Sequence, residues 1–309
     1  MTLLQRTAFR CALSLMCLLL AGGCSMVRVG YSHFDSVAAW MANDYFDLNA
    51  DQRDAFAQRF ERLHAWHRYE QLPDYVQFLT DTRNRAQRGL QADDMLWLVD
   101  GVKSRYRLIA ARAAPDAADL LATLTPSQIE SFRREIDKAN QKFLREYRTN
   151  GSVAERRQAQ RSTTLSQLRD WVGSLSDAQE QRISTLLLQV PLTDKLRHED
   201  HLRRQRELLV LLEWRAGDRR MFTQRVRDWL VLWESSRSPE LAHGLDESWR
   251  KRAVFYAAVD RLLTVEQRTH LTHRLQDFID DFRQLAERKP AAAKTDWDRM
   301  AGTFMSKPR

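Results

Sequence analysis

The sequence predicts an all-α protein with about ten amphipathic helices, packed as an elongated multi-helix bundle. Three observations support this prediction. Apolar residues recur at helical spacing along the chain, as at Phe56, Phe60 and Leu63. The sequence lacks sustained period-two runs of β-branched residues and lacks hairpin turns between such runs. Finally, one short phrase typical of helix starts occurs four times.

The composition limits the class of protein. The chain has 309 residues, of which 43% are hydrophobic and 29% are charged, and its formal net charge is +8. This length is enough for one large domain or two modest ones with buried cores. The composition excludes a collagen, a multispanning membrane protein and a disulfide-stapled miniprotein.

The first element, residues 1–23, is predicted to be an export signal. It begins with a basic segment containing Arg6 and Arg10, and continues as an apolar run that ends in small residues. A membrane-spanning helix needs about 20 apolar residues, so this shorter run is more typical of a secretory signal.

The next residue, Cys24, is a predicted lipidation site. The segment Leu20-Ala-Gly-Gly-Cys24 resembles the lipobox of bacterial lipoproteins, in which the cysteine thiol takes a diacylglycerol and the new amino group is acylated, typically with palmitate. Ser25, in place of Asp, indicates the outer membrane by the sorting rule of enterobacterial lipoproteins. The expectation is therefore a protein anchored by lipid to the periplasmic face of the outer membrane. The alternative is an ordinary export signal followed by a coincidental cysteine.

Beyond Cys24 the chain is predicted to form two helical halves, residues 24–150 and 151–289, followed by a disordered basic tail over 290–309. Proline and glycine residues are expected to start, stop or kink the helices. These positions are Pro73, Gly89, Pro115, Pro126, Gly151, Gly173, Pro191, Gly217 and Pro239.

The repeated phrase is Leu, then Asn, Thr or Ser, then two residues, then Gln. This pattern predicts a capping box, in which the Asn, Thr or Ser side chain accepts from an amide of the first turn and the Gln reaches back to the amide of the cap. The four copies are Leu48-Asn49-x-x-Gln52, Leu124-Thr125-x-x-Gln128, Leu175-Ser176-x-x-Gln179 and Leu263-Thr264-x-x-Gln267. Their unequal spacing argues against a solenoid of fixed period. It suits a duplication, with two copies in each half.

The phrase resembles the Leu-Thr-x-x-Gln motif of the Spy/CpxP family, all-helical periplasmic chaperones that work without ATP through cradle-shaped surfaces. Asn49 and Ser176 depart from the threonine of that motif. More broadly, the order lipobox, Trp40, Tyr45, Trp66-His-Arg and Leu72-Pro73 resembles a family of uncharacterised bacterial lipoproteins. That resemblance implies an envelope location and an all-α fold, and it carries no known activity.

Histidines are the candidates for metal binding, because six of the eight occur in pairs three residues apart. The pairs are His64 and His67, His198 and His201, and His270 and His273. Neighbouring arginines and the lack of matching acidic residues favour ordinary histidines at a helix surface or core edge. No metal or other cofactor is therefore expected.

No motif of an enzyme class occurs, so a non-enzymatic protein is expected. Asp277, Asp280 and Asp281 are interpreted as a surface ion-pair set beside Arg274 and Arg283. Arginine runs such as Arg203-Arg204 suit an anionic lipid or an acidic envelope protein better than nucleic acid in an exported protein, or they are helix faces paired with acids. The expected function is a binding or scaffolding role in the envelope. The alternative is a Spy/CpxP-like chaperone or envelope-stress sensor.

Overall fold

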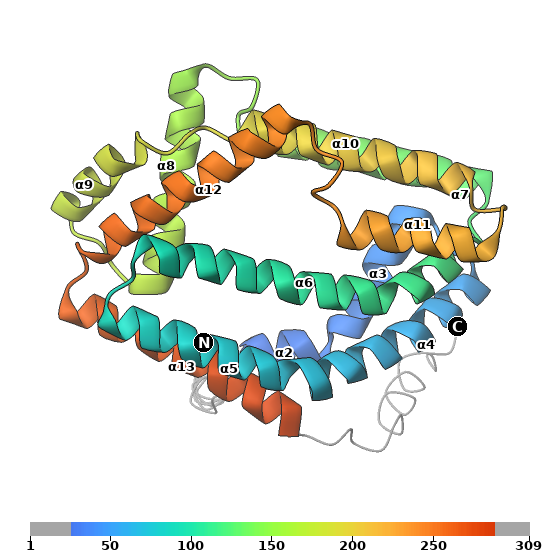
Figure 1. Cartoon of the computed structure of the whole chain (residues 1–309), viewed down its shortest axis with the longest axis horizontal. Helices are drawn as coiled ribbons and strands as arrows, with labels where there is room; N and C mark the ends of the chain where they lie inside the picture. Colours follow the sequence, from blue (N-terminus) through green and yellow to red (C-terminus); the bar gives the residue numbers. More distant parts are fainter. Residues whose placement is uncertain (1–25, 288–309) are drawn as a thin grey trace, which may run out of the picture.

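The computed structural model describes residues 26–287, and this part of the chain consists of helices and loops without a strand (Figure 1). The predicted all-α bundle is confirmed. Residues 1–23, Cys24 and the segment 290–309 lie outside the described residues. The helices are α2 (Met26–Ser32), α3 (Phe34–Phe46), α4 (Ala50–Trp66), the π-helical turn η1 (His67–Gln71), α5 (Leu72–Arg88), α6 (Ala92–Leu121), α7 (Pro126–Glu146), α8 (Val153–Val172), α9 (Asp177–Leu187), α10 (Asp194–Glu213), α11 (Arg219–Val231), α12 (Pro239–Asp260) and α13 (Val265–Glu287).

Helices α4 and α5 are joined through the π-helical turn rather than by a loop. Pro73 lies in the first turn of α5, where it has no N–H to donate to the preceding turn. The backbone widens at this point, and the N–H of Leu72 donates to the carbonyl of His67, five residues back. Pro73 therefore widens one turn of a continuous helical segment.

Helix α6 is the longest helix of the described chain and packs against α11 and α12 (Figure 1). Pro115, which is expected to start, stop or kink a helix, neither starts nor ends one, because it lies inside α6. Its neighbours Ala114 and Ala118 are completely buried. Close packing on both sides of the proline thus holds the helix together despite the missing hydrogen bond.

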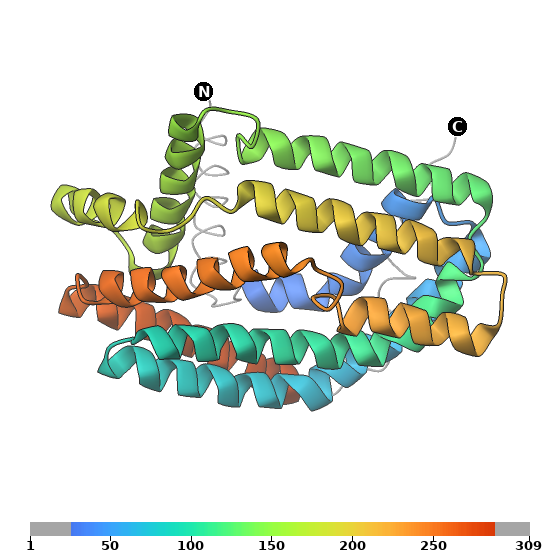
Figure 2. The same cartoon turned by 45° about the horizontal axis from the view of Figure 1, so that its top comes forward.

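The predicted halves share their packing. One hydrophobic cluster combines Leu48 and Phe132 from the first half with Leu212 and Phe222 from the second. Helix α5 lies along α13 (Figure 1), and α7 lies beside α10 (Figure 2). A second cluster, which includes Leu165, joins α8, α9 and α12. The division at residue 150 falls in the loop between α7 and α8, while the contacts run across it.

All four predicted capping boxes are formed. The side chains of Asn49, Thr125 and Ser176 accept from the backbone N–H of the Gln three residues on, and each Gln accepts from the backbone N–H of its cap. Thr264 and Gln267 make the same two hydrogen bonds, at 3.2 and 3.0 Å. The local spacing was therefore sufficient to locate these helix starts.

The first two boxes also bind each other through their glutamines. Gln52 Nε2 donates to Gln128 Oε1 at 3.2 Å, and Gln128 Nε2 donates to Gln52 Oε1 at 2.6 Å. Gln52 Nε2 also donates to the carbonyl of Thr123, and Gln128 Nε2 to that of Asp47. Both side chains are buried, so this amide pair is an internal tie between the starts of α4 and α7.

The third and fourth boxes repeat the arrangement. Gln179 Nε2 donates to Gln267 Oε1 at 2.7 Å, and Gln267 Nε2 donates back to Gln179 Oε1 at 3.1 Å. Their remaining donors reach the carbonyls of Leu262 and Ser174. The four motifs therefore form two reciprocal glutamine pairs, first with second and third with fourth.

Candidate binding cavity

A cavity of about 900 Å³ lies among α5, α6, α8, α12 and α13. Its walls are mainly apolar and aromatic. They include Phe78 and Leu79 of α5; Leu98, Val99, Val102 and Tyr106 of α6; Leu168 and Trp171 of α8; Trp249 and Tyr256 of α12; Leu271 and Leu275 of α13; and Trp97 and Trp233. Val102, Tyr106, Trp171 and Trp249 are exposed to solvent, so the cavity is open along part of its length. Ligand pockets of proteins occupy about 300–1,000 Å³ and are predominantly apolar, which is the character of this cavity.

The close approach of α5 and α6 forms part of the cavity wall. Gly101 of α6 stands against the ring of Phe78, and a Cβ at this position would collide with that ring. Phe78 also packs on Trp97, with ring centroids 4.9 Å apart, and the guanidinium of Arg105 lies 3.9 Å from the Phe78 ring centroid. Glycine at position 101 therefore sets the distance between the two helices at this wall.

Charged groups near the turn between α5 and α6 are paired with one another. Asp94 is 5% exposed and accepts from Arg88 at 2.7 Å and from Arg85. Burial alone raises the pKa of Asp94, but the bonds from Arg88, the Gln91 backbone and Arg85 outweigh it and lower that pKa. The carboxylate is thus held ionised at the cavity edge.

Asp260 closes the same end of the cavity. It accepts from the backbone N–H of Leu90 at 3.1 Å and forms an ion pair with Arg268 at 2.9 Å. Arg268 also donates to the carbonyl of Ala86. One buried carboxylate therefore connects the α5–α6 turn to α12 and α13.

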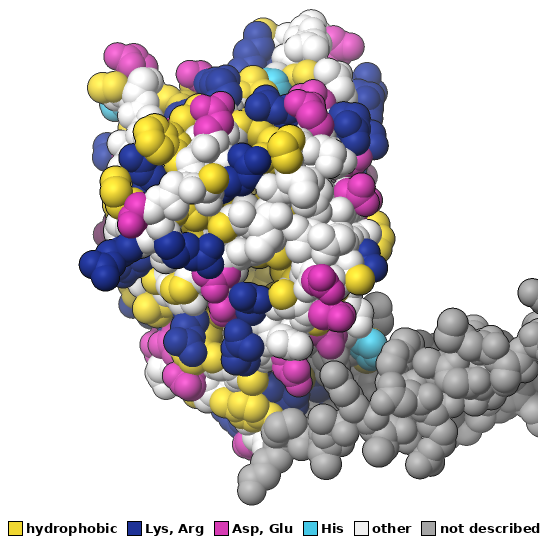
Figure 3. Space-filling view, turned by 90° about the vertical axis from the view of Figure 1, so that its right-hand side faces the viewer, with side chains coloured by type: hydrophobic (Ala, Val, Ile, Leu, Met, Phe, Trp, Pro, Cys, Tyr) yellow, Lys and Arg dark blue, Asp and Glu magenta, His cyan; other side chains and the backbone are white. Residues whose placement is uncertain are grey.

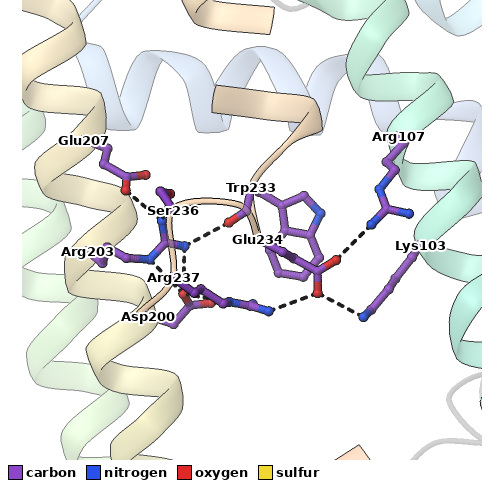
Figure 4. Close-up of polar contacts among 9 residues, drawn as sticks. All are labelled: Lys103, Arg107, Asp200, Arg203, Glu207, Trp233, Glu234, Ser236 and Arg237. Atoms are coloured by element: carbon purple, nitrogen blue, oxygen red, sulfur yellow. Dashed lines mark hydrogen bonds and ion pairs between the residues drawn. The ribbon is translucent and has the colours of Figure 1, made fainter. Parts of the chain in front are cut away.

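A second charged network lies at the loop between α11 and α12, where Figure 4 shows side chains from α6 and α10 meeting those of the loop. Glu234 accepts from Lys103 of α6, Arg107 of α6 and Arg237, each at 2.9 Å. Burial raises the pKa of Glu234, but the hydrogen bond from Lys103 and the other nearby cations outweigh it, so the pKa lies below its usual value.

Asp200 of α10 extends this network. It pairs with Arg237 at 2.7 Å and with Arg203 at 2.8 Å (Figure 4). Arg203 also contacts Glu207 and the carbonyl of Trp233. Burial raises the pKa of Asp200, and the hydrogen bonds from Arg237 and Arg203 reverse that effect and lower it. Among the labelled side chains, four cations surround three carboxylates.

Trp233 connects the cavity to a surface groove of about 540 Å³ between α10 and α11, because its side chain lines both. Arg237 lies 4.6 Å from the ring centroid of Trp233. The indole Nε1 of Trp233 is buried and has no hydrogen-bond partner among the described residues. Arg203, Arg206 and Arg225 line the groove, with two acids, Glu207 and Asp228.

The basic runs are largely engaged in contacts of this kind. Arg203 is paired with Asp200, and Arg204 lies 4.7 Å from the ring centroid of Trp229. On the face at the right-hand end of Figure 1, basic, acidic and hydrophobic side chains of the described chain are interspersed (Figure 3). The arrangement agrees with the interpretation of the arginine runs as paired helix faces.

The predicted surface ion-pair set on α13 includes one residue, Asp281, that is buried. Asp280 accepts from Arg283 at 3.0 Å on the surface, as expected. Asp281 is wrongly placed in that surface set, because it is 7% exposed and forms an ion pair with Arg28 of α2 at 3.1 Å. The helical turn directs it inward, where α2 packs against α13.

The first histidine pair lies in an aromatic cluster. The hydroxyl of Tyr31 is 2.8 Å from His67 Nδ1, and the hydroxyl of Tyr75 is 3.3 Å from His67 Nε2. Burial and then the neighbouring His64 lower the pKa of His67 to about 4, and burial raises the pKa of Tyr31. The neutral imidazole therefore bridges two tyrosines.

The other pairs also lack metal-site geometry. His198 and His201 pack on the ring of Phe143, while His270 and His273 are exposed. Within residues 26–287 no group of three or more His, Cys, Asp or Glu side chains could hold a metal ion. None of the helices in that range is long and apolar enough to cross a membrane.

The sequence did not reveal the cavity. Helical spacing alone assigns its tryptophans, including Trp233, to a core. The only signal was the abundance of this residue, with nine tryptophans in the chain. Periodicity shows that a helix face avoids water, but it does not show whether protein atoms or a cavity lie opposite.

Fold and cavity together define an all-helical protein with an apolar, partly open cavity. The chain belongs to a family of unknown function, DUF6279, whose family model matches residues 44–240. The matched segment contains the first three capping boxes and α6, and it ends at the start of α12. No curated protein and no solved structure matches the chain.

Proposed function

We propose that this protein is a lipid-anchored, non-enzymatic binding module of the bacterial cell envelope, and that the cavity is its ligand site. The lipobox-like segment ending at Cys24 supports anchoring, and Ser25 supports the periplasmic face of the outer membrane. The observation that carries the binding role is the cavity itself.

The size of the cavity indicates that solvent or a ligand occupies it. Empty apolar cavities cost about 24 cal/mol per Å³, so a dry void of about 900 Å³ would cost about 20 kcal/mol. Domains are stable by only about 5–15 kcal/mol. The space must therefore be occupied, either by solvent through its open side or by a ligand. Water gains little beside walls with few hydrogen-bonding groups, which favours an apolar occupant.

The polar groups of the cavity support binding rather than catalysis. Arg85 is paired with Asp94, Asp260 with Arg268 and Lys103 with Glu234. Among residues 26–287, no His, Ser or Cys lines the cavity. These pairs hold helices together at the cavity edge and leave the walls as an apolar contact surface.

The binding role is tested with a neutral apolar dye, N-phenyl-1-naphthylamine, whose fluorescence rises when it leaves water. Leu98→Trp places a larger side chain in the cavity wall and is expected to weaken dye binding about tenfold or more. The matched control is Leu108→Trp on the same helix, where the side chain is 51% exposed and outside the cavity. Equal binding by both variants would refute the cavity as the site.

The anchor is tested by cell fractionation. Cys24→Ala is expected to move the protein from the membrane to the soluble periplasm, because covalent acyl chains supply the anchoring energy at about 0.8 kcal/mol per buried CH₂. Ser25→Asp is expected to keep it in the membrane fraction and shift it to the inner membrane. Unchanged membrane association of Cys24→Ala would contradict the proposal.

A second candidate function is a Spy/CpxP-like chaperone or envelope-stress sensor. The observation that favours it is a set of large apolar side chains exposed on α10, α11 and α12 and in the loops after α10 and α11, which a client protein could contact. They are Val210, Trp214, Met221, Leu232, Trp249 and Val254. The glutamines of the repeated motif, in contrast, tie the helices to each other.

Light scattering of an aggregating client distinguishes this function. A chaperone is expected to suppress scattering, and Trp214→Ser should weaken the effect while Leu98→Trp leaves it intact. Absence of suppression at excess protein would remove the chaperone candidate.

A further inference from the structure

We propose that the cavity binds the acyl chain of an anionic amphiphile, with the tail along α6 and the anionic head beside Lys103, Arg107 and Trp233. This inference rests on the proposed function of the cavity as a binding site and names the class of its ligand.

The length of the cavity fits an acyl chain. Its lining on α6 extends from Asp94 to Tyr106, which at about 1.5 Å per residue is about 18 Å. The hydrocarbon core of a bilayer is about 30 Å thick, so one leaflet provides about 15 Å. An extended chain of the kind found in membranes therefore fits along the α6 wall.

The two ends of this wall differ in what they offer to a head group. At the Asp94 end the carboxylates are almost fully buried and fully engaged, with Asp94 5% and Asp260 4% exposed. At the other end, Val102 and Tyr106 are exposed and Arg107 is 45% exposed. At this end a head group can reach both solvent and charged side chains.

The open end carries an unused donor. The indole N–H of Trp233 is buried without a partner among the described residues, and leaving such a donor unmet is costly. Trp233 lines both the cavity and the groove. The Nε1 atom is closed off from solvent in this conformation, so a head-group oxygen can accept from it once the indole ring turns toward the cavity.

The charge at this end is positive. Lys103, Arg107 and Arg237 all contact Glu234, and Arg237 also pairs with Asp200, so the network of Figure 4 has four cations and three carboxylates. The groove beyond Trp233 adds more arginines than acids. A carboxylate or phosphate head would gain charge-assisted hydrogen bonds here, whereas an ammonium head would be repelled.

The test compares heads on one tail, using the full chain purified as the Cys24→Ala variant so that no covalent acyl chain competes. Displacement of the neutral dye is measured at slightly alkaline pH for four compounds, each kept below the concentration at which it aggregates. They are dodecanoate, dodecyl phosphate, dodecanol and dodecylammonium. Dodecanoate or dodecyl phosphate is expected to bind at least about tenfold more tightly than dodecanol, and dodecylammonium more weakly than dodecanol. The two anionic compounds distinguish a carboxylate from a phosphate head.

The contribution of the proposed head site is measured within one variant as the ratio of dodecanoate to dodecanol affinity. Lys103→Met and Arg107→Met are each expected to reduce this ratio to below about threefold. The control Lys138→Met removes the same charge from an exposed site on α7 and should keep the ratio of the wild type. Thermal unfolding of each variant establishes that it is folded.

The outcomes separate the two proposals. Equal affinity for dodecanoate and dodecanol in the folded wild type, or preference for dodecylammonium, would overturn the anionic ligand and leave the binding function standing. Failure of the wild type to bind the neutral dye, or equal binding by Leu98→Trp and Leu108→Trp, would overturn the proposed function first. A head preference that survives both Lys103→Met and Arg107→Met would refute the placement of the head.

Discussion

The buried pair formed by Gln52 and Gln128 predicts a strong energetic coupling between residues far apart in the chain. The two side chains exchange two hydrogen bonds, at 3.2 and 2.6 Å, and each also caps its own helix start. Gln128→Leu removes four hydrogen bonds: these two, the cap to the Thr125 N–H and the bond to the Asp47 carbonyl. At about 1 kcal/mol each, the expected loss of stability is about 4 kcal/mol.

The double variant distinguishes a pair from two separate caps. Because both single substitutions remove the same two shared bonds, Gln52→Leu with Gln128→Leu should cost about 2 kcal/mol less than the sum of the singles. The assay is urea unfolding followed by circular dichroism, with the free energy of unfolding extrapolated to water.

The control is Gln58→Leu on α4, where the glutamine is exposed and a change within about 0.5 kcal/mol is expected. If the costs of Gln52→Leu and Gln128→Leu add to within about 0.5 kcal/mol, the reciprocal pair does not couple the helices. A single cost below about 1 kcal/mol would also refute the reasoning, because it would mean that water replaces the lost partners.

Two further predictions concern buried polar groups. His67 has a pKa of about 4 in the folded protein, against about 6.5 when unfolded, so the unfolded state binds a proton first and stability should fall as the pH drops from about 6.5 to about 4. After discounting for partial exposure, the free energy of unfolding of the wild type, measured in urea, should fall by about 1–2 kcal/mol more across this range than that of His67→Gln. The exposed-site variant His273→Gln should follow the wild type. Equal losses in the wild type and His67→Gln would contradict a buried neutral imidazole. Arg156→Met should cost about 3 kcal/mol in thermal unfolding, because it leaves Asp194, 8% exposed, without the cation that contacts it at 2.7 Å. A cost no larger than that of the exposed-site variant Lys138→Met would show that this ion pair is not needed.

The helix starts were predictable because their information is local. Asn49 and Gln52 are three residues apart, and a capping box requires nothing beyond that spacing and the right side chains. The partner of Gln52 was not predictable, since Gln128 is 76 residues away and no local rule selects it. Four similar motifs allow several pairings, and only the packing of the helices decides among them.

Pro115 shows that the local rule by which proline ends a helix can be outweighed by packing. A proline inside a helix removes one hydrogen bond and costs about 3 kcal/mol or more, so the sequence predicts that Pro115 starts, stops or kinks a helix. In the folded chain the completely buried Ala114 and Ala118 pack α6 against its neighbours around that point. Burial along a helix of 30 residues outweighs one missing bond, and that burial depends on residues distant in sequence.

The cavity follows from the same limitation. Trp229 and Trp233 are four residues apart, a spacing that by itself predicts two core positions on one helix, whereas α11 ends at Val231, before Trp233. In the structure both side chains line the groove, but Trp229 also packs beside the first hydrophobic cluster, while Trp233 also lines the cavity. The pattern of apolar residues records only which side chains avoid water. Since contact with a core and contact with an apolar cavity both keep a side chain away from bulk water, a wall of such a cavity has the same sequence signature as a core. The cavity becomes visible only when the volumes on both sides of the helix are compared.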